Sequence, residues 1–146
     1  MKRMHLLVPG ACFAASLLVA IPAMSAQDLA MTGPLPPEQR QGSVTYLSGG
    51  IGQDESDAMR RQEANFPLAL EFIKHENGKG YYLSGCNVTV KDQQGRTVLS
   101  TVADGPFLLA NLPDGTYTVT ADDQGQSKQR QVVIAARKAQ RVVFEW

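Results

Sequence analysis

The clearest alternation of hydrophobic and polar positions follows residue 115. Tyr117 and Val119 fall on one side of an extended chain, and the threonines at 116, 118 and 120 fall on the other. This period of two predicts a strand with one buried face. The segment Pro113-Asp114-Gly115 precedes it, and its proline and Asp-Gly pair favour a tight turn. We therefore predict a turn over residues 111–115, followed by a central strand of a β-sandwich.

Further short runs of β-branched, aromatic and aliphatic residues recur every eight to twelve positions, with turn-forming residues between them. The expected strands cover residues 44–47, 66–73, 81–83, 86–90, 96–102, 107–109, 127–134 and 140–146. In the second of these runs, alternation places Phe66, Leu68, Leu70 and Phe72 on one face. This spacing is typical of a sandwich or small barrel. We predict one all-β, Greek-key sandwich of about seven strands.

Helix signals dominate in one place, at about residues 54–65. Asp54 and Asp57 are spaced like a capping arrangement, and Arg60 and Arg61 lie further along, which suits the helix dipole. The apolar stripe is thin and consists of Ala58, Met59 and, just before the helix, Ile51. A helix with so narrow a stripe belongs at the surface or edge of the sandwich.

The first residues have the features of a secretory signal peptide. Lys2 and Arg3 precede an apolar run over residues 6–21, and the small residues up to Ala26 form a cleavage region. We expect cleavage after Ala26, with a cut after Ser25 as the alternative, and a periplasmic or secreted protein. The apolar run is too short for an uncleaved membrane span, which needs about 20 residues.

The remaining domain boundaries follow from composition. Residues 27–42 are proline-rich with little apolar periodicity, which predicts a semi-rigid linker before a sandwich at residues 43–146. Cys12 raises the question of a lipid anchor, but Pro9 stands where such a signal needs an aliphatic residue. Without residues 1–26 the chain keeps 12 basic and 14 acidic residues, a net charge of −2. Nucleic acid is therefore not an expected partner.

One cysteine and one histidine remain after residue 26. Cys86 lies beside Gly85 on the same alternation as Val88, so we expect a small buried residue; a reactive or dimer-forming thiol is the alternative. His75 lies in a charged turn and is expected to be a solvated loop residue. Catalytic zinc needs three protein ligands, and a serine or cysteine nucleophile needs a base within reach. We expect no metal, no cofactor and no catalytic residue.

Three other patterns could indicate a binding site, for an anion, for calcium or for a sugar, or could be purely structural. The glycines of residues 48–52 precede a helix and would suit an anion, but the acidic residues at 54, 55 and 57 oppose it. The same carboxylates lack the spacing of a calcium loop. A sugar-stacking strip would use aromatic residues, and the candidate ligand contacts are Tyr46, Tyr81 and Tyr82.

From about residue 84 to residue 146 the chain resembles the carboxypeptidase regulatory-like domain, a transthyretin-like (prealbumin-like) sandwich. The matching segments are Cys86–Val90, Gln94–Val98, Ala103–Leu109 and Leu112–Val119. The last carries the family's Leu-Pro-x-Gly-x-Tyr motif, which implies structural roles for Leu112, Pro113, Gly115 and Tyr117. The family's glycine-aromatic pair is missing, and Asp122–Gly125 stands in its place.

The resemblance implies a module rather than an enzyme. In metallocarboxypeptidases this sandwich accompanies a separate zinc-containing domain, for which this chain has no room. We expect a non-enzymatic, exported module that binds a protein or cell-envelope component through sheet edges or loops; the alternative is a carbohydrate- or small-ligand-binding module. Val142, Phe144 and Trp146 alternate in the last strand. Trp146 should therefore pack along the rim of the sandwich, with its indole N–H bonded to a partner.

Overall fold

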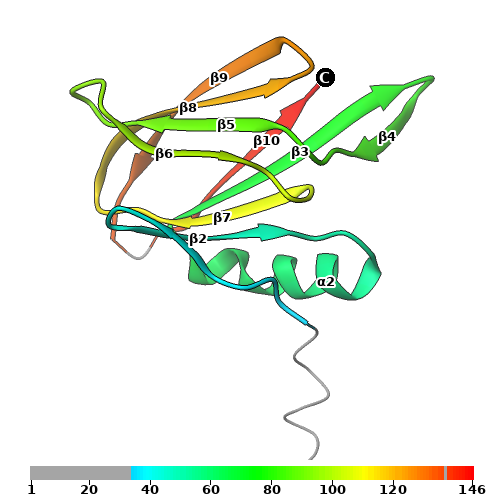
Figure 1. The fold of residues 1–146 in the computed structure, drawn as a ribbon, viewed down its shortest axis with the longest axis horizontal. Helices are drawn as coiled ribbons and strands as arrows, with labels where there is room; N and C mark the ends of the chain where they lie inside the picture. The colour runs from blue at the N-terminus through cyan, green and yellow to red at the C-terminus, as the bar shows by residue number, and fades with distance from the viewer. Residues whose placement is uncertain (1–33, 137) are drawn as a thin grey trace, which may run out of the picture.

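A computed structural model describes residues 34–136 and 138–146, so the expectations for the signal peptide and Cys12 concern residues outside the described part. The described residues form ten strands, one α-helix and one 3₁₀ helix (Figure 1). In chain order these elements are β1 (Gln39–Gln41), β2 (Val44–Gly49), α2 (Gln53–Gln62), η1 (Glu63–Asn65), β3 (Leu68–Glu76), β4 (Lys79–Tyr82), β5 (Asn87–Lys91), β6 (Thr97–Val102), β7 (Phe107–Asn111), β8 (Gly115–Asp123), β9 (Gln126–Ile134) and β10 (Gln140–Glu145). Within this part of the chain, no helix is long and apolar enough to cross a membrane.

The strands form two sheets, which confirms the predicted sandwich with one short helix. The six-stranded sheet has the order β1-β2-β7-β3-β10, and β4 pairs with β3. The four-stranded sheet has the order β6-β5-β8-β9, so the strand after residue 115 is central, as predicted. The strand count exceeds seven partly because β1 is short and entirely polar, Gln-Arg-Gln, and so carries no alternation. β1 also lies within residues 27–42, where we expected a linker.

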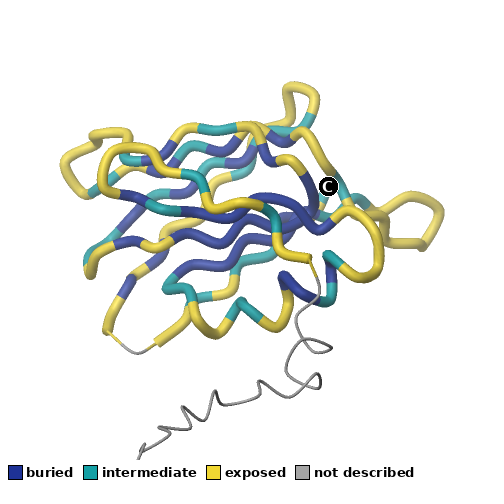
Figure 2. The backbone as a smooth tube through the Cα atoms, turned by 60° about the horizontal axis from the view of Figure 1, so that its bottom comes forward, coloured by how far each residue is buried: buried dark blue, intermediate teal, exposed yellow. Residues whose placement is uncertain are grey.

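The main core lies between the two sheets, where the buried segments meet in Figure 2. Leu68, Leu70 and Phe72 of β3 face it, as the alternation predicted. From the other sheet, Val88 and Val119 pack into the same cluster. Both inner faces are built from every second residue of a strand, which is why period-two patterning located them.

A second, smaller cluster lies on the outer face of the six-stranded sheet, under α2. Met59 of the helix is fully buried there against Leu47, Ala69, Phe107 and Leu109. Phe66 packs against this outer cluster, so its expected position on the inner face with Leu68 is wrong. The reason is that β3 begins only at Leu68, after η1 has turned the chain.

Helix α2 starts one residue earlier and ends three residues earlier than predicted. Its N-cap is Gly52, which has no side chain, and no side chain caps the helix, so the capping role expected of Asp54 is wrong. Ile51 is 65% exposed and does not join the buried stripe. The helix is held by burial of Ala58 and Met59 rather than by its cap.

The predicted turn before β8 carries the chain from one sheet to the other. Leu112 is buried in the main core, and the hydroxyl of Tyr117 donates a 2.8 Å hydrogen bond to the carbonyl oxygen of Pro113. Gly115 has a φ of 156° and lies against the Tyr117 ring: a β-carbon placed on it would be 3.5 Å from that ring. The tyrosine thus ties the corner to the core.

The last strand, β10, runs parallel to β3 and forms the edge of the six-stranded sheet. Beyond it, the backbone N–H of Trp146 donates to the carbonyl of Ile73, and its carbonyl accepts from the N–H of His75. The Trp146 ring stacks on Phe144 with centroids 6.1 Å apart, and its indole N–H donates to the carbonyl of Gln126, 2.8 Å away. Trp146 therefore packs at the rim with a bonded indole, as expected.

Candidate functional site: a pocket between β4 and α2

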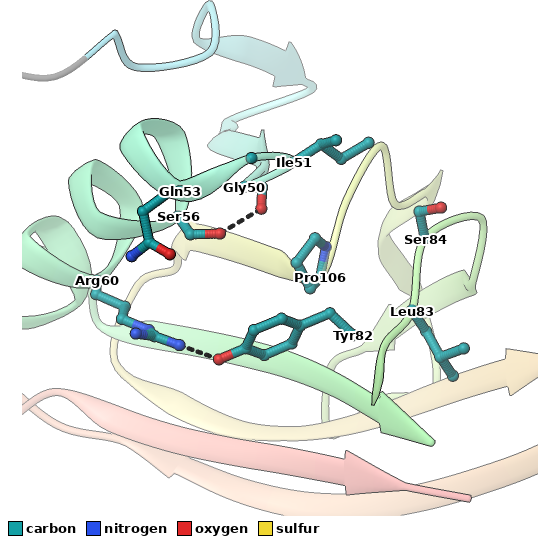
Figure 3. Close-up of a pocket in the computed structure, with 10 residues that line it drawn as sticks. Gly50, Ile51, Gln53, Ser56, Arg60, Tyr82, Leu83, Ser84 and Pro106 are labelled. Atoms are coloured by element: carbon teal, nitrogen blue, oxygen red, sulfur yellow. Dashed lines mark hydrogen bonds between the residues drawn. The ribbon is translucent and has the colours of Figure 1, made fainter. Parts of the chain in front are cut away.

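A pocket lies between the end of the β3–β4 hairpin and the start of α2. Its volume is about 410 Å³. The loop after β2 and the first two turns of α2 form one wall, and the end of β4 with the segment before β7 forms the other (Figure 3). The lining residues are Gly50, Ile51, Gly52, Gln53, Ser56, Arg60, Tyr82, Leu83, Ser84 and Pro106.

Arg60 and Tyr82 meet at one side of this pocket. The guanidinium group of Arg60 donates a hydrogen bond to the Tyr82 hydroxyl, and the two side chains point toward each other in Figure 3. The central carbon (Cζ) of the Arg60 guanidinium is 5.6 Å from the ring centroid of Tyr82 and 5.6 Å from that of Phe107. A planar guanidinium is well suited to such stacking, and two aromatic contacts with one hydrogen bond limit its rotamers. The cation is therefore held at the pocket wall.

The wall formed by α2 and the loop that precedes it is fixed by bonds between these two segments. The hydroxyl of Ser56 donates to the carbonyl of Gly50 at 2.5 Å, and the N–H of Gly50 donates to a carboxylate oxygen of Glu55 at 2.6 Å. Both bonds run from the first turn of the helix back to the loop. The Glu55 carboxylate is consequently bonded to the loop and does not line the pocket.

Among the ten lining residues, Arg60 is the one with a charged side chain. Its side chain is 45% exposed, and its nearest carboxylate is that of Asp57, 3.9 Å away. Asp57 also accepts a 2.9 Å hydrogen bond from the side-chain amide of Gln53. Exposed pairs of this length contribute little free energy, so the guanidinium keeps capacity for another anion.

The three tyrosines predicted as ligand contacts have different positions. Tyr46 is 7% exposed and belongs to the main core, with its hydroxyl bonded to Gln39 and Thr101, so its prediction as a ligand contact is wrong. Because side chains alternate along β2, the Tyr46 side chain points into the core between the two sheets. Tyr81 and Tyr82 are 50% and 47% exposed, and Tyr82 lines the pocket. The two are neighbours in one strand and thus face opposite sides of it.

Arg60, Gln53 and Ser84 line the pocket, although no pattern in the sequence indicated them as site residues. Arg60 was assigned only to the helix dipole. Its partner Tyr82 is 22 positions away and lies on a strand of the hairpin, so no local spacing links the two. The pairing depends on how α2 crosses the outer face of the sheet.

A charged cluster on the same outer face was also missed. Glu71 of β3 is buried, and Arg141 of β10 pairs with it and lies 3.4 Å from a carboxylate oxygen of Glu63. Burial raises the pKa of Glu63, the negative charge of Glu71 raises it further, and Arg141 opposes both. The parallel pairing of β3 with β10 places Ala69 opposite Arg141 and so brings Glu71 near. The cluster ties η1 and both strands together.

His75 lies near the end of β3 rather than in a loop, so its assignment to a turn is wrong, although it is exposed. The turn comes after it, at Asn77 and Gly78. Its Nε2 is 3.7 Å from a carboxylate oxygen of Glu145. In residues 34–136 and 138–146, no group of three or more histidine, cysteine, aspartate or glutamate side chains is arranged to hold a metal.

Cys86 is fully buried in the main core. Burial raises the pKa of its thiol to about 11, and the carboxylates of Asp123 and Asp122 add to the effect. At pH 8 the thiolate then amounts to about one molecule in a thousand, and thiolate is the reactive form. We predict that a maleimide reagent labels Cys86 in the protein beginning at residue 27 only after denaturation. Rapid labelling of the native protein, or a dimer that separates on reduction, would contradict this.

Comparison with known proteins identifies the family. The model of the carboxypeptidase regulatory-like domain matches residues 74–146, half of the chain. The match begins at residue 74, near the end of β3, and continues through β10. It thus begins ten residues before the expected start at residue 84. A search of the curated proteins found no match.

The pocket lies at the boundary of the matched region. Gly50–Gly52, Gln53, Ser56 and Arg60 precede it, whereas Tyr82, Leu83, Ser84 and Pro106 lie within it. Domains of this type are β-sandwich modules and are generally non-catalytic. Because the matched region contains the Leu112–Tyr117 corner and most strands of the sandwich, the chain belongs to the carboxypeptidase regulatory-like domain family.

Proposed function

We propose that this protein is a non-catalytic, exported module that binds a protein of the cell envelope through the pocket between β4 and α2. The observation that carries the proposal is the pocket itself, about 410 Å³ in volume, with exposed apolar and aromatic side chains on both walls. Ile51 is 65% exposed on the loop wall, and Tyr82 is 47% exposed on the strand wall.

These residue types support a protein partner. The centres of protein interfaces are enriched in tyrosine, tryptophan and arginine, and a few such side chains around a pocket supply most of the binding free energy. Tyr82 and Arg60 are held by each other and by Phe107 before any partner arrives. Binding would therefore cost little conformational entropy at these two side chains.

A carbohydrate-binding module was the alternative, and the geometry favours it less. Sugar stacking needs the open face of an aromatic ring. Tyr46 is buried, and the Tyr82 ring contacts Arg60 and Phe107, each at 5.6 Å. Among the three tyrosines, Tyr81 alone remains for a sugar. We therefore place protein binding first and let the experiment distinguish the two.

Site-specific photo-crosslinking in intact cells tests the proposal. A photoreactive amino acid replaces Ile51 at the pocket or, as the control, Val133 on β9, which is similarly exposed at 59%. We expect one dominant protein adduct from position 51 and none from position 133. The purified adduct should also begin near Gln27 if the protein is exported and processed.

Two results would contradict the proposal. One is equal crosslinking from positions 51 and 133, or none from position 51. The other is selective binding to an array of peptidoglycan fragments and glycans that is lost when Tyr81 is replaced by alanine, which would favour the carbohydrate module.

A further inference from the structure

One side of β4 is a free strand edge. Leu83 donates its N–H to the carbonyl of Phe72, which makes this a hydrogen-bonded pair of the β3–β4 hairpin. Because such pairs alternate with non-bonded ones in antiparallel strands, the N–H and C=O groups of Tyr81 face β3, and those of Gly80 and Tyr82 face away. Among the described residues, β4 pairs with β3 alone, and these outward groups have no backbone partner. The edge can therefore accept another strand.

The bonds on the opposite side of β3 support the same orientation. The carbonyl of Ile73 and the N–H of His75 bond to Trp146, so these two residues face away from β4. Their partners across the hairpin are Tyr82 and Gly80. The outward direction of the Gly80 and Tyr82 backbone groups thus follows from two independent sets of hydrogen bonds.

The free edge ends at the pocket. After Tyr82, the N–H groups of Leu83 and Gly85 are taken by the carbonyls of Phe72 and Ala103. Pro106 also lines the pocket there and has no N–H to offer. Strand pairing along β4 cannot continue past this point. A peptide that runs parallel to β4 would therefore reach its end in the pocket.

The charge at that end selects a carboxylate. Arg60 carries the one charged side chain of the lining residues, and it is held in place by the rings of Tyr82 and Phe107 and by the Tyr82 hydroxyl. The carboxylates of Glu55 and Asp57 are bonded to Gly50 and Gln53 and do not line the pocket. A guanidinium pairs with a carboxylate through two parallel hydrogen bonds, which a lysine cannot reproduce.

We propose that the free edge of β4 and the adjoining pocket bind the carboxyl-terminal end of an extended peptide chain, with the terminal carboxylate on Arg60. This inference rests on the proposed binding function and specifies the part of the partner that is recognised. The main chain of the peptide pairs with Gly80 and Tyr82, and the carboxylate sets the register.

Peptide arrays test the inference directly. Randomised peptides of eight residues are displayed in three sets: with a free carboxyl terminus, with an amidated terminus, and amidated with an internal glutamate. We expect binding from the free-carboxylate set alone. Fluorescence anisotropy on the best peptide then measures the variants. Arg60→Gln should weaken binding about tenfold to a hundredfold, the value of a charge-assisted hydrogen-bonded pair.

Matched variants separate binding from folding. Arg61→Gln removes the same charge from a neighbouring exposed position of α2 and should bind like the parent. Gly80→Pro removes an outward N–H that the hairpin does not use and should weaken binding about tenfold, whereas Gly80→Ala should not. Each variant is first shown to melt with the parent, and should Arg60→Gln fail to fold, Gly80→Pro still decides.

Several results would overturn the inference: equal binding of amidated peptides, preference for the internal glutamate, no binding of any peptide at millimolar concentration, or full affinity in both Arg60→Gln and Gly80→Pro. The crosslinking experiment keeps the proposed function separate. An adduct at position 51 that persists in Arg60→Gln would support protein binding and overturn carboxylate recognition. Absence of both the adduct at position 51 and peptide binding in the parent protein would overturn the two proposals together.

Discussion

Replacing Gly105 with alanine is expected to lower the free energy of unfolding by about 3 kcal/mol. Gly105 is buried just before β7, and a β-carbon there would lie 2.4 Å from the carbonyl oxygen and 2.5 Å from the carbonyl carbon of Gly49. Both are backbone atoms of β2, which is paired with β7 through Gly49 and Phe107. No side chain can rotate away to relieve the contact.

A backbone shift would also strain neighbouring contacts. The N–H of Asp104 donates a 2.8 Å hydrogen bond to the hydroxyl of buried Ser48, one residue before the close approach. The control is Gly80→Ala in β4, where the nearest atom to the new β-carbon is Ile73 Cγ2 at 3.5 Å, an ordinary contact. Its expected effect is within about 0.5 kcal/mol. Urea unfolding followed by circular dichroism measures both, and a Gly105→Ala protein with the parent's midpoint would refute the prediction.

Replacing Trp146 with alanine should lower the free energy of unfolding by about 2–4 kcal/mol, slightly less than for a fully buried aromatic ring, because Trp146 is only partly buried. The change removes the stacking on Phe144 and the indole hydrogen bond to Gln126, which links the edge strands β10 and β9 of the two sheets. Separation of these edges would expose strand groups to other chains. We therefore also expect aggregation on heating.

Trp146→Phe provides the control, because phenylalanine keeps an aromatic ring against Phe144 and loses the indole N–H. It should cost about 1 kcal/mol, the value of one hydrogen bond. Native emission of this single tryptophan should be blue-shifted and should move to the red on unfolding. Solvent-exposed emission in the native protein, or an unchanged melting temperature for Trp146→Ala, would show that the ring does not pack against the rim.

Much of the four-stranded sheet was predictable because its strands carry their own pattern. Val88 and Val90, and Tyr117 and Val119, occupy alternate positions and all face the main core. The hairpin turn between β5 and β6 was also local: the Asp92 carboxylate accepts hydrogen bonds from the N–H groups of Gln94 and Arg96. Structure that depends on contacts between residues close in sequence can be recognised from the local sequence pattern.

The six-stranded sheet was less predictable at its edges. β1 is polar and has no alternation, and it is held by register with β2 and by the side chain of Gln41, which bonds to both backbone groups of Ser100 on β6. The Gln41 side-chain amide thus takes the place of a paired strand at Ser100, on the edge strand β6 of the four-stranded sheet. Gln41 and Ser100 are 59 positions apart, so no local pattern indicates the contact.

The candidate site shows the same division. Exposure of Tyr81 and Tyr82 agrees with their selection as ligand contacts, whereas Tyr46, of the same residue type, is buried. A tyrosine has an apolar ring and a polar hydroxyl, and it suits a core whenever the hydroxyl finds a partner, as Tyr46 does in Gln39 and Thr101. Residue type alone therefore cannot separate the two environments.

By itself, the sequence determined the all-β sandwich, the short helix, the corner from Leu112 to Tyr117, the burial of Cys86 and the packing of Trp146, because each depends on alternation or on turn chemistry within a few residues. The tertiary structure alone decided which pocket exists. Arg60 reaches Tyr82 only because α2 lies on the outer face of the sheet, and the free edge of β4 arises only because the hairpin extends beyond β7. Both depend on pairings between distant segments, whose free energy comes from burying surfaces that no local stretch of sequence specifies.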